Sequence, residues 1–115
     1  MKKKIYIDFD GVLNNYNGWK GNNELFEPQT GVKDFLNKLS LSYKIYIFSA
    51  RNPLDIADWL IKHNLRKYIS NITNVKNPAY AYIDDRAIRF DGDYSKILFE
   101  LEDFKPHWQI NNEDV

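Results

Sequence analysis

Residues 4–13 read KIYIDFDGVL, and this stretch decides the predicted fold. Its first part, residues 4–9, is rich in β-branched and aromatic side chains, which is typical of a buried β-strand. Asp8 and Asp10 stand two positions apart, so the alternation of a strand places both carboxylates on one side. Polar groups at the end of a buried strand need a partner. The stretch therefore predicts a strand that ends in a polar site.

Strand-like and helix-like patterns alternate along the rest of the chain. Apolar, β-branched runs predict the strands, and apolar residues at i, i+3, i+4 and i+7 predict the helices. The expected strands cover residues 4–9, 44–48, 69–72, 79–83 and 88–90. The expected helices cover residues 31–41, 53–63 and 94–104. Such alternation predicts an α/β fold, with a three-layer, Rossmann-like parallel sheet flanked by helices on both faces.

Local signals refine the ends and faces of these elements. Thr30 is placed to cap the first helix, and Asn52 followed by Pro53 is a typical start of the second. The second helix has apolar residues on most of its sides, so we expect it to be well covered. The polar tail at about 105–115 is expected to be loose, with Trp108 as an anchor. The last helix carries one apolar face, made of Tyr94, Ile97, Leu98 and Leu101.

Length and composition limit the classes of protein that fit. The 115 residues suit one domain spanning 1–115, with a flap at about 14–29 and no room for a large cap domain. Lys+Arg and Asp+Glu both number 16, so the net charge of zero gives no overall attraction to nucleic acid or to an anionic membrane. No stretch is long enough to span a bilayer. The absence of cysteine excludes disulfides and thiolate metal sites and predicts a reducing, cytoplasmic location.

Polar groups follow three of the predicted strands. Asp8 and Asp10 end the first, Ser49 ends the second, and Asp84 and Asp85 follow the AYAYI strand. The carboxyl ends of parallel strands meet at one edge, where ligands bind. Two carboxylates about 5 Å apart repel by roughly 3 kcal/mol at an effective dielectric constant near 20. A hard divalent cation with oxygen ligands offsets this repulsion, so the predicted cofactor is Mg²⁺.

Ser49 gives a second kind of signal. It stands just before the helix that starts near Asn52, and a helix N-terminus presents free N–H groups and positive potential that favour a phosphate group. A serine at a strand end is common, and by itself it would carry little weight. Beside the acidic residues, it predicts a phosphate pocket next to the cation.

These motifs, in this order, resemble those of the haloacid dehalogenase superfamily of phosphohydrolases. Residues 5–13 look like its first motif, an apolar strand followed by D-x-D-G-(V/T)-L, and residues 45–49 look like its second, an apolar strand ending in Ser or Thr. Lys76 stands where the lysine of the third motif is expected, and residues 82–85 look like the fourth. The resemblance covers most of the chain and implies a small, minimally capped member of bacterial or phage type.

The resemblance implies a phosphomonoester hydrolase that works through an aspartyl-phosphate on Asp8. Asp10 would protonate the leaving oxygen and then activate water, and neighbouring negative charge is expected to favour its protonated form. Lys76 would neutralise charge on the nucleophile and on the transferring phosphoryl group. The implied ligands of Mg²⁺ are Asp8, the Asp10 backbone carbonyl and Asp84, together with Asp85, which would act either directly or through water.

The resemblance also implies a phosphate pocket and an open entrance. The gap at 14–30 fits only a small flap, and the gap at 66–79 fits no cap at all. The site is therefore expected to admit bulky phosphorylated substrates as well as small phosphomonoesters, unless the second subunit of a homodimer closes it. Whether Arg51, Arg86 and Trp19 contact the substrate stays open at this stage. The implied phosphate-binding residues are Gly11, Ser49, Ala50 and Arg51.

Three other functions fit parts of the pattern. A polynucleotide end phosphatase shares these motifs, although the neutral net charge argues against nucleic acid as the substrate. A non-catalytic phosphate receiver also uses acids, a Ser/Thr and a Lys on a parallel sheet, but its phospho-accepting Asp follows a middle strand, whereas here D-x-D follows the first. A catalytically dead binding module should lack part of the set. The set that is present comprises Asp8, Asp10, Ser49, Lys76 and Asp84.

Overall fold

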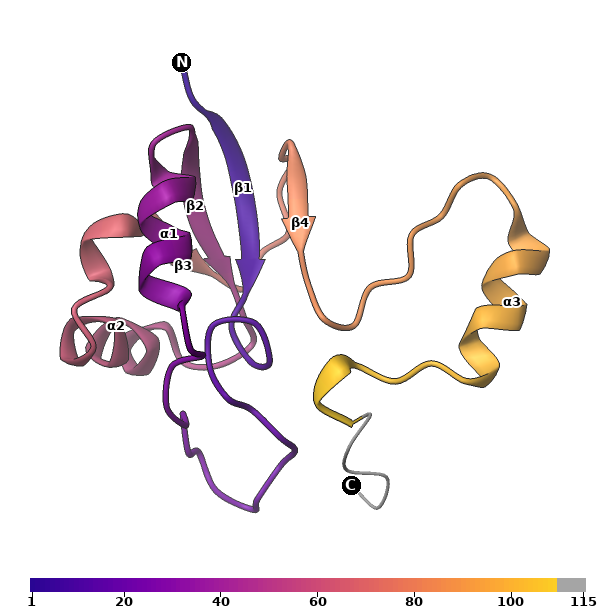
Figure 1. Cartoon of the computed structure of the whole chain (residues 1–115), viewed down its shortest axis with the longest axis horizontal. Coiled ribbons are helices and arrows are strands. Elements are labelled where there is room, and N and C mark those ends of the chain that lie inside the picture. Colours follow the sequence, from indigo (N-terminus) through magenta and orange to yellow (C-terminus); the bar gives the residue numbers. More distant parts are fainter. Residues whose placement is uncertain (110–115) are drawn as a thin grey trace.

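The computed structural model describes residues 1–109, which form an α/β fold around a four-stranded, all-parallel sheet of order β3-β2-β1-β4 (Figure 1). The strands are β1 (Lys3–Asp8), β2 (Tyr43–Phe48), β3 (Asn71–Thr73) and β4 (Ala81–Ile83). The helices are α1 (Val32–Ser40), α2 (Pro53–Lys62) and α3 (Tyr94–Glu102), with short 3₁₀ helices η1 (Arg66–Tyr68) and η2 (His107–Gln109). The predicted α/β class, with a Rossmann-like parallel sheet flanked by helices, is confirmed.

Some predicted elements differ from the observed ones. Residues 88–90 form no strand, so the strand expected there is wrong. β1 ends at Asp8, and the next residues turn, so Asp10 does not lie on the strand as expected. Residues 74–80 join β3 to β4 without a helix. Most of the predicted tail, residues 110–115, lies outside the described residues.

The strand register brings the predicted polar ends together. β1 lies between β2 and β4, and Ile7 pairs with Ile47 on one side and with Ile83 on the other. Asp8, the next residue of β1, pairs with Phe48 at the end of β2. Because all strands are parallel, the residues that follow β1, β2 and β4 therefore emerge at one edge of the sheet, called here the carboxyl edge.

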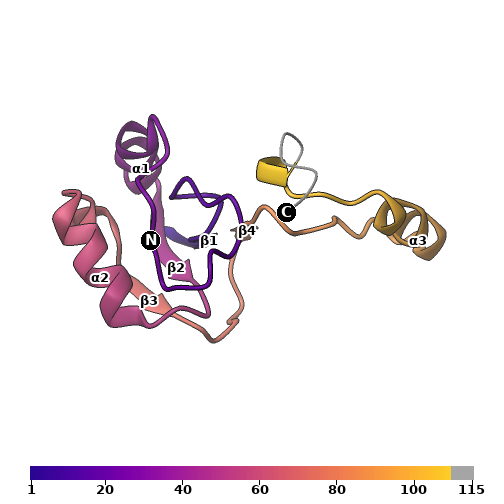
Figure 2. The same cartoon turned by 90° about the horizontal axis from the view of Figure 1, so that it is seen from below.

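One face of the sheet holds the main hydrophobic core. Alternation along β1 and β2 points their isoleucines to this face. α1 and α2 both lie on the same side of the sheet and cover these isoleucines (Figure 2). The chief members of the core are Ile5, Ile7, Ile45, Ile47, Val32, Leu36, Ile56 and Leu60.

The opposite face of the sheet is aromatic. Tyr6 is buried at its centre, with its ring 5.4 Å from that of Tyr46 and stacked at 5.3 Å on that of Tyr82. The connection 74–80 reaches this face, where Asn77 Nδ2 donates a hydrogen bond to the Tyr6 hydroxyl at 3.3 Å. The Tyr82 side chain stays exposed. We call this surface the tyrosine face, and it is made of Tyr6, Tyr46, Phe48 and Tyr82.

The starts of the first two helices differ in how they are capped. The Asn52 side chain accepts a hydrogen bond from Leu54 N at 2.8 Å and Pro53 occupies the first turn, so the predicted start of α2 is confirmed. α1 is preceded by Gly31 at φ 86° and has no side-chain cap, so the predicted capping by Thr30 is wrong. Gly31 adopts this left-handed conformation without the penalty that a side chain brings.

α2 is less covered than its sequence predicts. Only the stripe that faces the core is buried, and it contains Ile56, Trp59 and Leu60. Leu54 and Ile61 are exposed, so the expectation that α2 is buried on most of its sides is wrong. Packing against one layer buries only one stripe of a helix.

The flap at residues 14–29 is a single small loop beside the carboxyl edge. A backbone bridge between Asn14 and Pro28 closes its base. Trp59 Nε1 donates a hydrogen bond to the Phe26 carbonyl at 2.8 Å and thereby ties the flap to α2. Within residues 1–109, nothing larger than this flap is inserted between the elements of the sheet.

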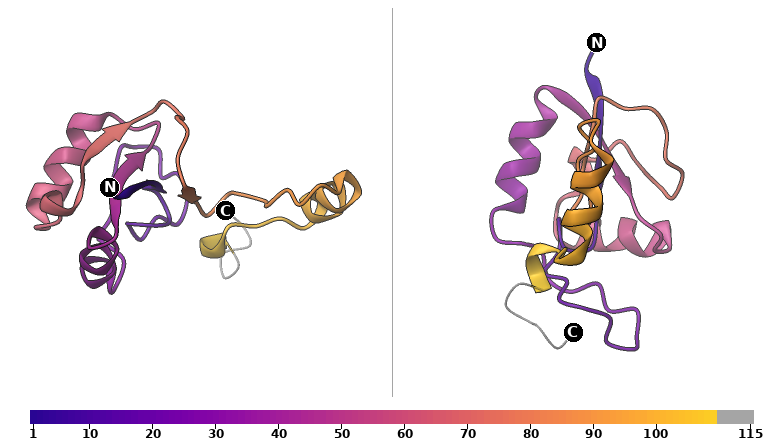
Figure 3. Two further views of the ribbon diagram at one scale, coloured as in Figure 1. Left: turned by 90° about the horizontal axis from the view of Figure 1, so that it is seen from above. Right: turned by 90° about the vertical axis from the view of Figure 1, so that its right-hand side faces the viewer.

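After β4 the chain leaves the sheet. Residues 86–106, called here the arm, carry α3 away from the rest of the molecule (Figures 1 and 3). No residue of α3 is buried, so its predicted apolar face lies in solvent. The chain then returns, and Trp108 Nε1 donates a hydrogen bond to Asp85 Oδ2 at 2.6 Å, which confirms Trp108 as an anchor. Across residues 1–109, every helix is too short or too polar to cross a membrane.

Candidate active site

Three carboxylates from distant parts of the chain meet at the carboxyl edge. Asp8 ends β1, and Asp84 and Asp85 directly follow β4. One oxygen of each carboxylate lies within 4.8 Å of one oxygen of the other two. The structure therefore brings together these three predicted residues, which we call the acidic cluster.

The acidic cluster changes the protonation of Asp8. Burial, then the side-chain hydrogen bond with Asp85 and the negative charges of Asp84 and Asp85, raise the pKa of Asp8 from 3.8 to about 8. The hydrogen bond from the Phe9 backbone acts in the opposite direction. We expected negative neighbours around Asp10, but the structure places them around Asp8. The turn after β1 instead pairs the Asp10 carboxylate with Arg51 and Asn14.

The donors of the acidic cluster fit a hard divalent cation. Asp85 Oδ1 is buried and, while Asp8 is ionised, has no hydrogen-bond partner among residues 1–109, whereas its Oδ2 accepts from Trp108. Asp84 Oδ1 accepts a hydrogen bond from Arg86 N at 2.7 Å. A buried carboxylate oxygen without a partner is costly, and a cation would satisfy it. Carboxylate oxygens are the ligands that Mg²⁺ prefers, so the residues present fit the predicted metal.

Asp10 belongs to a separate hydrogen-bonded group. Its Oδ2 accepts from Arg51 Nε at 2.7 Å, and its Oδ1 accepts from Asn14 Nδ2 at 3.0 Å. Both side chains of the Asp10–Arg51 ion pair are partly buried. The pair thus holds Asp10 beside the acidic cluster with both carboxylate oxygens occupied.

Asn14 is a site residue that the sequence analysis missed. It is fully buried, and its Oδ1 accepts from Gly11 N at 2.9 Å and from Tyr16 N at 3.1 Å. Its Nδ2 donates to Asp10 and to the Leu25 carbonyl, so one side chain fixes the turn after β1 and the start of the flap. The chain is rich in asparagine, and isolated asparagines therefore carried little signal. Its place directly after the first motif was the available clue.

A cavity of about 250 Å³ opens between the acidic cluster and the Asp10–Arg51 pair. A second cavity of about 330 Å³ shares Asp10 and Arg51 with it and extends toward Trp19 on the flap. Arg86 and Trp19, left open by the sequence, therefore line space next to the acidic cluster. The first cavity is lined by Asp8, Asp10, Tyr16, Ser49, Ala50, Arg51, Asp84 and Arg86.

Ser49 is held rigidly in the wall of the first cavity. Its backbone N–H donates to the Thr73 carbonyl at 2.9 Å, and its Oγ accepts from Arg51 N at 3.1 Å. A hydroxyl that accepts one hydrogen bond can still donate its own proton. Ser49 is thus arranged to donate to an anionic oxygen in the cavity.

Two predicted residues lie in other surroundings than expected. Lys76 Nζ lies 5.1 Å from the centre of the Tyr82 ring, and Lys76 does not line either of the two cavities. Lys76 therefore does not lie beside Asp8 as expected, because the connection 74–80 follows the tyrosine face. The Gly11 N–H donates to Asn14, so Gly11 offers a phosphoryl oxygen no free N–H here.

Comparisons with known proteins support the fold and name no function. No family matches the chain, and no curated protein matches it. It resembles one solved structure, that of a conserved protein from Bacteroides thetaiotaomicron, with 20% sequence identity and a TM-score of 0.60. The match covers 91% of this chain and 93% of that one. At this identity the similarity shows that the two chains share a fold.

Gly11 has a steric role at the site. It has φ +84°, and a Cβ built on it would lie only 2.8 Å from Trp108 Cδ1 and would overlap Asp85 Oδ2. His107 Nε2 also makes a hydrogen bond with the Gly11 carbonyl. The turn after β1, the acidic cluster and the chain after the arm thus meet at a position where only a glycine fits.

Gly11→Ala is expected to displace Trp108 and Asp85 and to lower the free energy of unfolding by about 1–3 kcal/mol, the range for a strained backbone position. Urea unfolding measures this loss. Gly21→Ala is the matched control, because Gly21 also has a positive φ, of 79°, but has open space around its Cβ position. Equal losses for the two variants would contradict the steric role.

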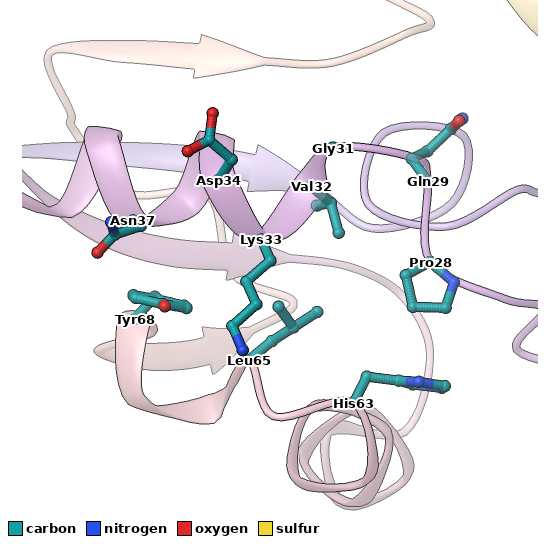
Figure 4. A pocket seen from close by; sticks show the side chains of 10 residues that line it. All are labelled: Pro28, Gln29, Gly31, Val32, Lys33, Asp34, Asn37, His63, Leu65 and Tyr68. Carbon is teal, nitrogen blue, oxygen red and sulfur yellow. The ribbon is translucent and has the colours of Figure 1, made fainter.

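A larger cavity lies away from the acidic cluster. It measures about 610 Å³ and lies beside α1, with Val32 and Lys33 on one wall and His63 and Leu65 on the other (Figure 4). Its lining contains one carboxylate, that of Asp34. Size alone does not supply chemistry, and the smaller cavities beside the acidic cluster hold the convergent charged groups.

Proposed function

We propose that this protein is a Mg²⁺-dependent phosphohydrolase in which the Asp8 carboxylate attacks phosphate monoesters. The observation that carries the proposal is the acidic cluster, which includes the buried Asp85 Oδ1 and whose Asp8 and Asp84 line a cavity together with Ser49 and Arg51. Clustered carboxylates repel one another and destabilise the folded state unless a cation lies between them. Hydroxyl and guanidinium groups donate hydrogen bonds to phosphoryl oxygens. The proposal places metal and phosphate side by side.

The metal would be held by Asp8, Asp84 and Asp85, with the Asp10 backbone carbonyl as a further oxygen ligand. When bound, Mg²⁺ supplies charge neutralisation that stabilises the phosphoryl group and the leaving oxygen. Trp108 holds Asp85 by its hydrogen bond to Oδ2, and Oδ1 would then be available to the cation. Such outer contacts fix the orientation of metal ligands.

The chain's own groups account for the two chemical steps. An Asp8 oxygen forms a bond to phosphorus as the bond from phosphorus to the ester oxygen breaks, and Asp10 gives that oxygen a proton. Asp10 then takes a proton from water, whose oxygen displaces Asp8 from phosphorus and releases inorganic phosphate. Ser49 and Arg51 hold the phosphoryl oxygens throughout. Arg51 turns from Asp10 to the substrate, which frees Asp10 to carry the proton.

The two adjoining cavities divide the substrate between them. The phosphoryl group occupies the cavity of about 250 Å³ next to Asp8, and the leaving group extends into the one of about 330 Å³ below Trp19. Trp19 is largely exposed on the flap. The substrate is thus a phosphate ester whose leaving group lies against the flap.

We also propose that the protein is located in the cytoplasm, because its chain has no cysteine.

A phosphatase screen with and without Mg²⁺ tests the function. With Mg²⁺ we expect release of inorganic phosphate from at least one ester among p-nitrophenyl phosphate, sugar phosphates, nucleoside monophosphates and a 3′-phosphorylated oligonucleotide. Chelation by EDTA should lower the rate at least about 100-fold, because four oxygen ligands then lose their cation. Unchanged hydrolysis in EDTA would contradict the metal, and hydrolysis of the oligonucleotide alone would identify a polynucleotide end phosphatase.

A further inference from the structure

The arm exposes several large apolar side chains, and none of the residues of its helix α3 is buried. Tyr94, Leu98 and Phe99 of α3 are 77%, 69% and 72% exposed, and Phe90 and Leu101 of the same arm are also exposed. Isolated helices shorter than about 12–15 residues are marginal in water, and α3 spans nine residues. Exposed apolar clusters of this kind mark interaction surfaces. α3 therefore needs a partner surface.

The tyrosine face of the same chain carries no helix and is only partly covered, by the connection 74–80, whose Asn77 contacts Tyr6 and Tyr82. α1 and α2 both cover the other face of the sheet, and α3 lies beyond β4, away from the tyrosine face (Figures 1 and 2). Tyr82 is exposed on this surface, and Tyr46 and Phe48 are half-buried. A parallel sheet normally has both faces covered. The chain thus presents an apolar helix and an aromatic sheet face that do not meet each other.

The two surfaces carry opposite charge. Three lysines stand over rings of the tyrosine face: Lys4 lies 4.8 Å and Lys44 5.9 Å from the Tyr46 ring, and Lys76 lies over Tyr82. In the arm, residues 91–103 carry a single lysine. Their carboxylates are Asp91, Asp93, Glu100, Glu102 and Asp103. Opposite potentials favour contact between this acidic segment and the tyrosine face, whereas two such segments repel each other. The arm as a whole is close to neutral, because Arg86, Arg89 and Lys105 flank the segment.

The chain on both sides of the arm is held at the carboxyl edge. The arm begins next to Asp85, which follows β4, and it ends before His107 and Trp108, which contact Gly11 and Asp85. In this arrangement α3 projects past the short strand β4 (Figure 3). A projecting arm is presented to another molecule, and exchange of an element between identical chains is an inexpensive route to a dimer.

We propose that the protein is a homodimer in which α3 of each chain packs on the tyrosine face of the other. The interface occurs twice, with Leu98 and Leu101 against the aromatic rings and the acidic residues of the arm against Lys4 and Lys44. The proposal is independent of the phosphohydrolase function.

A mixing experiment tests the exchange. The parent should have twice the chain mass of 13.7 kDa by light scattering. Leu98→Asp removes the arm contact and Tyr82→Asp removes the face contact, so each variant alone should be monomeric. Each of the two identical interfaces loses an anchor worth about 30-fold, so the dimer dissociation constant should rise about 10³-fold. In an equimolar mixture, the Tyr82→Asp arm fits the intact face of the Leu98→Asp chain, and both substitutions fall in the other interface. If Leu98 packs on Tyr82, as proposed, that interface loses one contact and not two, so the mixed dimer should be weakened only about 30-fold and should form where neither variant alone does.

Two further variants guard against misfolding and against other arrangements. Leu41→Asp, on a residue that is 73% exposed beyond α1, should leave the parent's mass unchanged. Lys4→Glu with Lys44→Glu should weaken the dimer without removing an apolar group, and circular dichroism should show every variant folded. A monomeric parent would overturn the proposal, as would a dimer that survives both Leu98→Asp and Tyr82→Asp. Failure of the mixture to dimerise would equally overturn it, since helix-to-helix pairing or docking on the chain's own face gives no such rescue.

Discussion

Replacing Asp8 by asparagine is expected to lower kcat/KM for the best phosphate ester by about 10³-fold or more. The amide keeps the shape of the side chain but loses the charge of the attacking oxygen and weakens the cation site. The protein should still fold, because the change removes one of three mutually repelling carboxylates. In the absence of divalent cations we therefore expect the variant to have an equal or higher melting temperature than the parent.

Asp34→Asn is the matched control for this prediction. Asp34 is a largely exposed residue of α1, in an ion pair with Lys38, and it has no part in the acidic cluster. Its replacement should leave kcat/KM within about twofold of the parent, as for most surface changes. If Asp8→Asn turned over substrate as fast as Asp34→Asn, Asp8 would not be the nucleophile.

The second large effect is a pH dependence of stability that Mg²⁺ reverses. The pKa of Asp8 is raised from 3.8 to about 8 in the folded chain. Between these values the native state binds more protons than the unfolded state, so the contribution of Asp8 to stability is lost as the pH rises through this window. Without divalent cations, we expect the melting temperature to fall between pH 5 and pH 8 more steeply than in Asp8→Asn, measured by thermal scans.

Mg²⁺ should remove this loss, because a cation favours the ionised carboxylates. At about 100 times its dissociation constant, a ligand of the native state stabilises by about 2.7 kcal/mol, which for a domain of this size raises the melting temperature by roughly 10 °C. Asp85→Asn should reduce both the fall with pH and the gain from Mg²⁺. A melting temperature that Mg²⁺ does not move at pH 8 would contradict a cation site in the acidic cluster.

Parallel pairing explains why the acidic cluster could be predicted from the sequence. Asp8 and Asp84 follow apolar strands, and parallel strands deliver their carboxyl ends to one edge whatever the details of packing. Ser49 met the same condition at the end of β2. These predictions rest on backbone topology, which the alternation of strand and helix patterns indicates well.

The contacts of Asp10 could not be predicted in the same way. The period-two rule applies only within a strand, and β1 stops at Asp8, so the turn decides where Asp10 points. Its partners Arg51 and Asn14 depend on the rotamers of long or buried side chains. Trp108 contacts Asp85 from a position 23 residues later in the chain, and no periodic pattern in the sequence predicts such a contact.

The helix α3 was predicted from the sequence, but its position in the fold was not. The sequence of α3 is amphipathic, with Leu98 and Leu101 on its apolar face. An amphipathic pattern indicates that a helix packs against a partner, but it does not identify that partner. The partner expected from a Rossmann-like sheet is the chain's own second face. The separation of α3 from that face depends on how residues 86–93 leave β4, and these residues form no regular element.

The hydrogen bond between Trp108 and Asp85 makes the arm a tether as well as a surface. While the chain is intact, Trp108 meets Asp85 at the millimolar effective concentration typical of a short linker. A protease that cut the exposed arm would turn this contact into an encounter between two fragments. Cleavage far from the cavity would then release the indole that holds Asp85, the proposed metal ligand, so loss of cation affinity would be an early sign of a nicked polypeptide.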